Sequence, residues 1–297
     1  MFRSEWIKLT VLSGAIFVAL ALQSDAQGRP PMRFHDEVKA EPLRLGAANV
    51  QLNGARSEIR DNSGMVRISA NGVPEHKVGS FPNAGNPNRI TAQRHHFKAP
   101  KGGETGTAQA FGLGSYFGVA INGVPFDPGA AEFWQGNPRS GWQYEALGGA
   151  VTLGLDANYA HVQPDGSYHY HGLPSGLMQD MGWTPNTASP LIGYAADGFP
   201  VYAITALVDG RLRAMQSSYK LKFGSRPGGA APGGVYDGAF VQDYTFRAGS
   251  GDLDECNGAI VRTAEHPQGS YAYFLTREFP VIPRCLKGQA NRSFSKR

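Results

Sequence analysis

Short runs of β-branched and aromatic residues recur along the chain from Ala48 onward, and clusters of glycine, proline and asparagine separate them. Residues 66–68, 116–121 and 194–202 are three such runs. Strands bounded by turn residues have this pattern, whereas an amphipathic helix repeats its apolar positions every three to four residues. The chain therefore predicts a mainly β fold with little helix.

Two glycine-containing segments refine this prediction. Residues 205–215 could be taken for a helix, but Asp209-Gly210 inside them is a strong hairpin signal. The glycine and proline run at residues 224–234 predicts a long surface loop rather than a linker, because the sequence on both sides is equally rich in turns. We expect one β domain over residues 46–290, built as a β-sandwich or an irregular barrel with long loops.

The N-terminus has the pattern of a signal peptide. Arg3 and Lys8 precede an apolar run at residues 9–22, and small residues follow it up to Ala26. This run is shorter than the roughly 20 residues that span a bilayer. We therefore expect cleavage of residues 1–26, with an uncleaved anchor as the alternative, and a flexible leader at residues 27–45. No other segment predicts stable membrane insertion, so the mature protein is expected to be periplasmic or secreted.

Composition and charge narrow the possible partners. The chain has 39 glycines, 20 prolines and a formal net charge of +4, with its charges scattered except in a basic tail at residues 291–297. This balance does not predict a nucleic-acid surface. We expect the tail to be solvated, with contact to an anionic membrane or polysaccharide as the alternative. An unidentified small molecule or polysaccharide is the expected ligand.

The chain contains two cysteines, Cys256 and Cys285. In an oxidising compartment, a pair of cysteines with no other partner predicts one disulfide bond. On the chain-entropy model such a bond stabilises the fold by about 3 to 4 kcal/mol. Two free buried thiols are the alternative.

The candidate chemistry lies in Tyr168-His169-Tyr170-His171. Residues two apart on a strand point to the same side, roughly 7 Å apart, so that both imidazoles can reach one ion while the tyrosines face the other way. A turn at residues 164–166 could return His161 to this pair. Three imidazoles suit zinc or copper, and Asp156 is a further candidate ligand that would extend the range to iron or manganese. A hydrogen-bonded structural histidine pair is the alternative.

A second segment of the chain repeats the pattern without the histidines. Gly166-Ser167-Tyr168-His169-Tyr170-His171 recurs as Gly269-Ser270-Tyr271-Ala272-Tyr273-Phe274. Both copies predict a strand opened by a turn. Because Ala272 and Phe274 replace the histidines in the second copy, strand packing alone does not require histidine in the first.

The motif at residues 168–174 resembles the one that names the YHYH family. Further motifs similar to family patterns lie at residues 71–76, 81–88, 122–127, 195–202 and 253–258. The resemblance covers about residues 65–288 and implies an exported domain built around a histidine motif, without implying a substrate or a reaction. His76 ends the first of these motifs and is a further candidate metal ligand, with turn capping as the alternative.

Three classes of function remain open. The first is an exported metal-binding protein that holds zinc or copper through His161, His169 and His171, with His76 and Asp156 as additional candidates. The second is a metal-dependent hydrolase or a copper oxidase-type enzyme, for which the chain identifies no catalytic residue and which needs an open coordination position. The third is a non-catalytic carbohydrate-binding or adhesion domain. Its expected stacking surface consists of Trp134, Trp142 and Tyr116.

Overall fold

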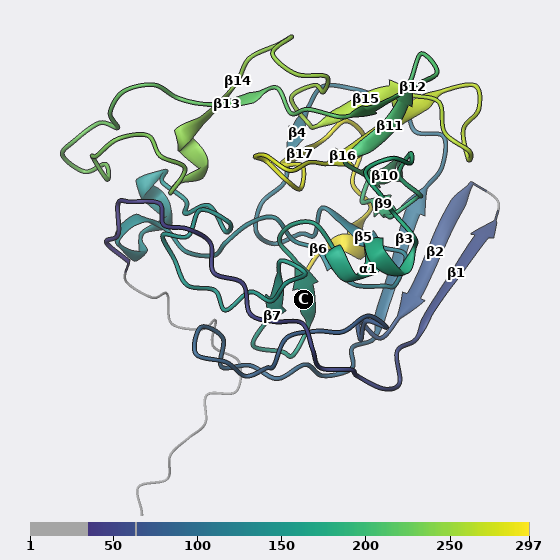
Figure 1. Cartoon of the computed structure of the whole chain (residues 1–297), viewed down its shortest axis with the longest axis horizontal. Helices are drawn as coiled ribbons and strands as arrows, with labels where there is room; N and C mark the ends of the chain where they lie inside the picture. The colour runs from purple at the N-terminus through teal and green to yellow at the C-terminus, as the bar shows by residue number, and fades with distance from the viewer. Residues whose placement is uncertain (1–34, 63, 297) are drawn as a thin grey trace, which may run out of the picture. The chain divides into compact units, whose positions relative to one another are not determined.

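The computed structural model of the chain describes residues 35–62 and 64–296, all within one structural unit (Figure 1). The predicted signal peptide and the first part of the predicted leader lie outside these residues. Among the described residues, none of the helices has both the length and the apolar character that a membrane crossing requires.

The largest element is a mixed sheet of eight short strands in the order β15-β16-β10-β9-β5-β6-β8-β7. The strands are β5 Gly118–Ala120, β6 Pro125–Phe126, β7 Ala160–Val162, β8 Tyr168–Tyr170, β9 Gly193–Ala195, β10 Pro200–Ala203, β15 Gly258–Val261 and β16 Ser270–Leu275. Neighbours are antiparallel except β10 with β16 and β6 with β8. Over the described residues the edge strands β15 and β7 do not pair with each other, so the sheet is open and no barrel closes.

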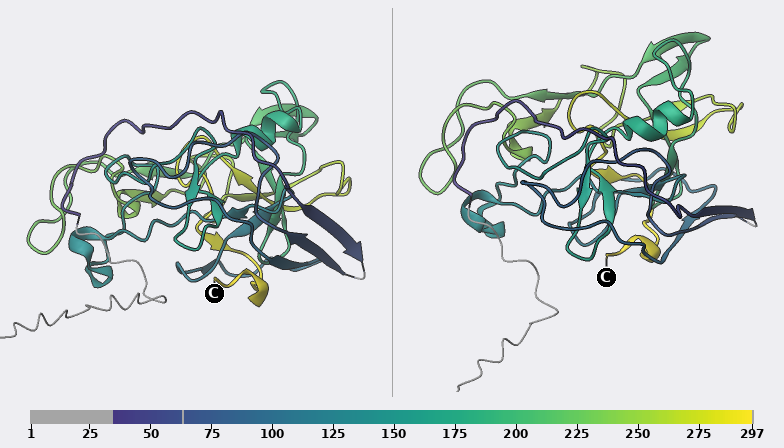
Figure 2. Two further views of the ribbon diagram at one scale, coloured as in Figure 1. Left: turned by 90° about the horizontal axis from the view of Figure 1, so that it is seen from below. Right: turned by 60° about the horizontal axis from the view of Figure 1, so that its bottom comes forward.

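A second sheet contains β1 Ser57–Asn62, β2 Met65–Ala70 and β3 His95–Pro100, all antiparallel. The three strands lie side by side in both Figure 1 and Figure 2. Val66 and Ile68 of β2 are fully buried, and the residue between them is exposed. This alternation places one face of the sheet against the core, as the apolar pattern predicts.

Three two-stranded pairs complete the sheets of the described residues. They are β11 Thr205–Val208 with β12 Arg211–Ala214, β13 Tyr219–Leu221 with β14 Tyr244–Phe246, and β4 Gln109–Ala110 with β17 Cys285–Leu286. The hairpin predicted at Asp209-Gly210 is confirmed, and both residues have the positive φ that a tight hairpin turn requires, 52° and 73°.

Helices are few and short, as expected. The single α-helix described is α1 Ser175–Asp180. Four 3₁₀ turns accompany it: η1 Trp134–Gly136, η2 Pro138–Ser140, η3 Val241–Asp243 and η4 Arg292–Phe294. The prediction of a mainly β domain with long loops and little helix is therefore confirmed.

The main hydrophobic core joins the two larger sheets through aromatic side chains. Phe117, Phe126 and Tyr273 have no exposed surface, and Phe97 of β3 stacks on Phe294 with ring centroids 4.8 Å apart. The predicted disulfide between Cys256 and Cys285 is confirmed, and both cysteines are buried in this core. The bond fastens the turn before β15 to the short strand β17.

The described part of the predicted leader packs on the domain rather than extending from it. Val38 and Leu43 lie against a second core that contains Trp134, Tyr144 and Phe240. The Tyr144 hydroxyl donates to the Glu37 carbonyl at 2.8 Å, and the buried Arg226 donates to the Val38 carbonyl at 2.6 Å. Residues 35–45 are thus part of the fold, because loops distant in sequence supply them with apolar and hydrogen-bonding partners.

The basic tail was expected to be solvated, but its described residues pack against the domain. Phe294 is buried beside Phe97, and the Ser295 backbone forms a bridge with Ser115. The Lys296 ammonium pairs with the buried Asp127 carboxylate. This segment therefore returns to the large sheet, close to strand β6.

Candidate metal centre

Strands β7 and β8 form an antiparallel hairpin that places His161 directly opposite His169. Hydrogen bonds between the backbones of Gln163 and residues 166 and 167 close the turn. Gly166 has a φ of 87°, which favours glycine, and a Cβ atom there would lie 1.9 Å from Thr91. The turn thus returns His161 to the histidine pair, as the sequence predicts.

Three imidazoles meet on one side of this hairpin. The Nε2 atom of His171 lies 2.9 Å from Nε2 of His169 and 3.1 Å from Nε2 of His161. One ring nitrogen from each residue falls within a group whose members are all within 4.8 Å of one another. The alternation of side chains along β8 produces this arrangement, since His169 and His171 share a face.

Backbone carbonyls orient two of the rings. Nδ1 of His161 lies 2.7 Å from the Leu153 carbonyl oxygen, and Nδ1 of His169 lies 3.2 Å from the Ser167 carbonyl oxygen. A carbonyl can only accept a hydrogen bond, so these contacts favour the tautomers in which each Nδ1 carries the proton and each Nε2 keeps its lone pair. The Asn86 amide nitrogen, a donor, lies farther from Nδ1 of His161, at 3.2 Å. Metal-binding histidines show this same outer contact.

Burial keeps the three rings neutral. His169 and His171 have 0% and 2% exposed surface, and His161 is partly exposed. Burial, followed by the repulsion that a protonated His169 would exert, lowers the pKa of His161 to about 3. Burial, followed by the charge of Lys296, lowers the pKa of His169 to about 3. Burial also holds the pKa of His171 well below its usual value. Neutral imidazoles can bind a cation at pH 7 without first losing a proton.

The spacing of the Nε2 atoms fits a shared cation. Two nitrogens bound to tetrahedral zinc at about 2.0–2.1 Å are about 3.3 Å apart, which is within a few tenths of an ångström of the observed 2.9 and 3.1 Å. A proton on Nε2 of His171 can point at only one of its two neighbours. Without a cation, at least one of the neighbouring Nε2 lone pairs is therefore left without a donor in a buried place.

Asp127 is a charged group near the histidines that was not among the predicted ligands. It is 2% exposed, its backbone N–H donates to the Tyr170 carbonyl, and it pairs with Lys296. Burial raises the pKa of its carboxyl, and the nearby Lys296 ammonium opposes that shift. The negative charge of the Asp127 carboxylate raises the pKa of His161 and so partly opposes the larger lowering by burial. The one feature of the sequence that pointed to Asp127 is its position at the end of the family-like motif at residues 122–127.

The tyrosines of β8 face the opposite side, where they bind the two other predicted ligands. The Tyr168 hydroxyl donates to Asp156 at 2.8 Å. The Tyr170 hydroxyl lies 2.6 Å from Nε2 of His76, whose Nδ1 contacts the Lys77 carbonyl oxygen.

The structure therefore brings together three of the five predicted ligands and separates His76 and Asp156 from them. Both carboxylate oxygens of Asp156 already accept backbone N–H donors, from Gly79 and Asn158. Burial lowers the pKa of His76, which serves as a buried hydrogen-bonding partner for Tyr170. Its position in a sequence motif did not reveal on which face of β8 it would lie.

The predicted aromatic stacking surface was wrong. Trp134 and Tyr116 are each 8% exposed and belong to the hydrophobic cores. Trp142 is partly buried and packs edge-on against Phe240, with ring centroids 5.6 Å apart. These rings stabilise the interior because the loops around them fold inward.

Comparison with known proteins identifies one family. The model of a family described as YHYH protein matches residues 96–288, which is well over half of the chain. The matched segment contains the three clustered histidines and Asp127, and it begins after His76. No curated protein and no solved structure matches the chain.

Proposed function

We propose that this chain, which belongs to the YHYH protein family, is an exported metal-binding protein that holds one zinc or copper ion. His161, His169 and His171 are the proposed ligands. The observation that carries the proposal is the convergence of three Nε2 atoms from rings whose other nitrogens are, in two cases, fixed by backbone carbonyls. This is the arrangement that preorganises imidazoles for a metal.

The donor set supports zinc or copper over harder metals. All three clustered ligands are imidazoles, which suit both ions. Asp156, the carboxylate that would have favoured iron or manganese, lies with the tyrosines and is saturated by hydrogen bonds.

The surroundings support binding more than catalysis. Two of the three histidines are buried, with 0% and 2% exposed surface, and a cavity of about 630 Å³ between described loops has none of the three in its lining. A zinc hydrolase or a copper oxidase needs an open coordination position that substrate can reach. His161 is the one partly exposed ligand, so a substrate of such an enzyme would have to approach the metal from the side of His161.

Export rests on the signal-peptide pattern at residues 1–26 and is supported by the disulfide bond. Disulfides form and persist in the periplasm and outside the cell, and are rare in reducing compartments. A periplasmic or secreted location is therefore part of the same proposal.

Calorimetric titration of metal-free protein with zinc and with copper tests the proposed site. We expect one strong site per chain, and a loss of affinity of at least about 100-fold in His169→Gln, more than the removal of an outer-sphere contact typically causes. His96→Gln is the matched control, because His96 is an exposed histidine of β3 whose Nδ1 lies 3.2 Å from the Ser69 hydroxyl, outside the histidine cluster. Equal affinities of the two variants would contradict the assignment.

A further inference from the structure

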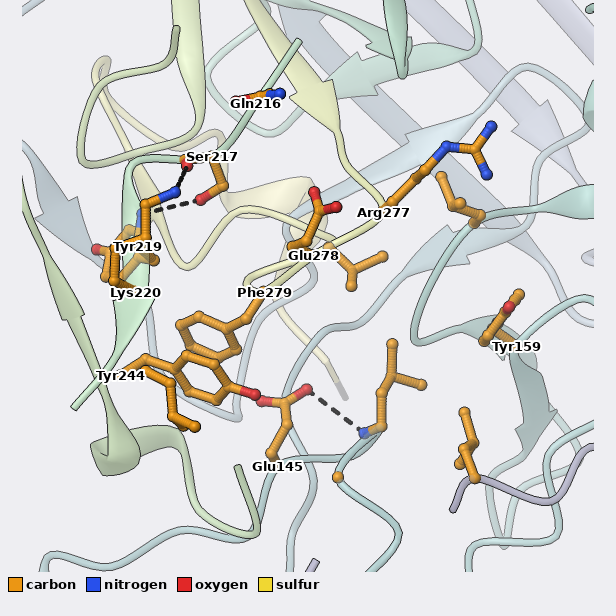
Figure 3. Close-up of a pocket in the computed structure, with 16 residues that line it drawn as sticks. Glu145, Tyr159, Gln216, Ser217, Tyr219, Lys220, Tyr244, Arg277, Glu278 and Phe279 are labelled. Atoms are coloured by element: carbon orange, nitrogen blue, oxygen red, sulfur yellow. Dashed lines mark hydrogen bonds between the residues drawn. The ribbon is translucent and has the colours of Figure 1, made fainter. Parts of the chain in front are cut away.

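A cavity of about 630 Å³ lies beside the histidine hairpin and contains none of the three histidines among its lining residues (Figure 3). Its volume is within the range of small-molecule sites. The walls come from segments far apart in sequence, including Leu147, Leu173, Leu221 and the turn at residues 277–281. The cavity therefore takes no part in the proposed metal site.

One wall of the cavity is aromatic. The rings of Tyr244 and Phe279 stack with centroids 3.9 Å apart and planes 4° apart, and Tyr219 meets Phe279 edge-on at 5.5 Å. Figure 3 shows these rings on one side of the cavity and Tyr159 on the other. Such walls favour ligands that present a flat apolar face.

Charged side chains of both signs line the same cavity. Glu145 is neutralised by Arg284, whose Nη2 lies 2.6 and 2.8 Å from the two carboxylate oxygens. Lys220, Arg277 and Glu278 also line the cavity. An anion would meet Glu278 and a cation would meet Lys220 and Arg277, so neither sign of ligand charge is uniformly favoured.

A neutral ligand rich in hydroxyl groups avoids this conflict. Each hydroxyl both donates and accepts hydrogen bonds, so that it can pair with ammonium, guanidinium, carboxylate or amide groups. Gln216 and Ser217 add an amide and a hydroxyl to the lining. The apolar C–H face of a sugar ring would then pack on the aromatic wall.

From this combination we infer that the cavity binds a carbohydrate, as a monosaccharide or a short oligosaccharide. The site is distinct from the proposed metal centre and does not depend on it. It also differs from the surface predicted from Trp134, Trp142 and Tyr116, which are not among the lining residues.

Tyr159 connects the cavity to the hairpin. It has a φ of 53°, an unfavourable conformation for a tyrosine, and it lines the cavity while its carbonyl accepts a hydrogen bond from the His171 backbone at 2.7 Å. Strain of this kind persists only where the surrounding structure fixes it, and it concentrates at ligand sites.

The test is a glycan array probed with the full mature protein, followed by calorimetric titration of the glycan that binds best. Leu221→Trp places a large ring at the mouth of the cavity, where Leu221 is 44% exposed. Leu212→Trp is the matched control, since Leu212 is 37% exposed in another two-stranded pair and does not line the cavity. Circular dichroism establishes that both variants fold.

We expect a glycan to bind with a dissociation constant below about 1 mM, and binding to weaken at least about tenfold in Leu221→Trp and not in Leu212→Trp. Binding should persist in metal-free protein and in His169→Gln, so that failure of the metal proposal leaves this result unchanged. Absence of binding across the array would overturn the inference. So would equal binding by the two tryptophan variants, or binding of 4-hydroxybenzoate, an aromatic anion, at the Leu221 site in place of any glycan.

Discussion

At the residue scale, strand β8 presents two different chemistries from its two faces. Tyr168 and Tyr170 direct their hydroxyls toward buried acceptors, which anchors the strand. His169 and His171 direct their Nε2 atoms toward each other and toward His161. Since a buried unpaired lone pair is unfavourable, the histidine face needs a proton or a metal ion to complete it, and the tyrosine face does not.

The histidines should make the metal-free protein sensitive to acid. The pKa values of His161 and His169 are about 3 in the folded protein, below the ordinary value of 6.5 that the unfolded chain regains. Protons therefore bind the unfolded state first, and stability falls as the pH drops from about 6.5 toward 3. In this pH range each histidine lowers the free energy of unfolding by on the order of 1.4 kcal/mol per pH unit.

Urea unfolding of metal-free protein between about pH 7 and pH 5 measures this slope. His169→Gln/His171→Gln removes two of the titrating groups and should flatten the profile. A parent profile as flat as that of the variant would show that the buried histidines do not control acid stability.

The sequence predicted these three histidines because the cause is local. A side-chain period of two residues places His169 and His171 together, and a turn signal returns His161. His76 and Asp127 could not be placed in this way. Their distance from β8 depends on how remote loops fold, and no local period encodes it.

At the scale of elements, the β7–β8 turn sets the geometry of the site. Gly166 follows Asp165 in a turn whose register places His161 opposite His169. Gly210 follows Asp209 in the β11–β12 hairpin, with a similar positive φ. The two turns differ in their surroundings, because a Cβ at residue 166 would collide with Thr91 and one at residue 210 would meet nothing within 4 Å.

Gly166→Ala should therefore destabilise the protein by about 2 to 3 kcal/mol and weaken metal binding, while Gly210→Ala should cost about 1 kcal/mol and leave metal binding unchanged. Urea unfolding and calorimetry with zinc give the two readouts. Similar losses of metal affinity in both variants would indicate that the hairpin register does not position the ligands.

Local hairpins were predictable, but the order of the large sheet was not. Asp209-Gly210 encodes its own turn, whereas β6 pairs with β8 and β10 pairs with β16 across long stretches of chain. Such pairings depend on the whole core and leave no local signal.

At the scale of the whole molecule, packing contacts, an ion pair and a disulfide bond hold the long segments without regular structure in place. Residues 35–45 pack on the second core, Lys296 pairs with Asp127, and the disulfide joins Cys256 to Cys285. The sequence predicted the disulfide because only two cysteines were available. It did not predict the docking of the leader or of the tail, since neither has an apolar period.

Removal of the disulfide in Cys256→Ala/Cys285→Ala should lower the free energy of unfolding by about 3 to 4 kcal/mol, because it frees a long loop in the unfolded chain. Guanidinium unfolding measures the change, and reduction of the parent protein controls for the lost thiol groups. A change below about 1 kcal/mol in both samples would mean that the core, and not the crosslink, holds β17 in place.

We propose that His161, His169 and His171 together hold one metal ion. Elemental analysis by mass spectrometry tests it on mature protein purified after export, beside a His169→Ala/His171→Ala variant whose fold is verified by circular dichroism. We predict about one zinc or copper ion per chain in the parent and almost none in the variant. A parent without metal, even after reconstitution with several ions, would contradict the claim and leave the cluster as a structural histidine motif.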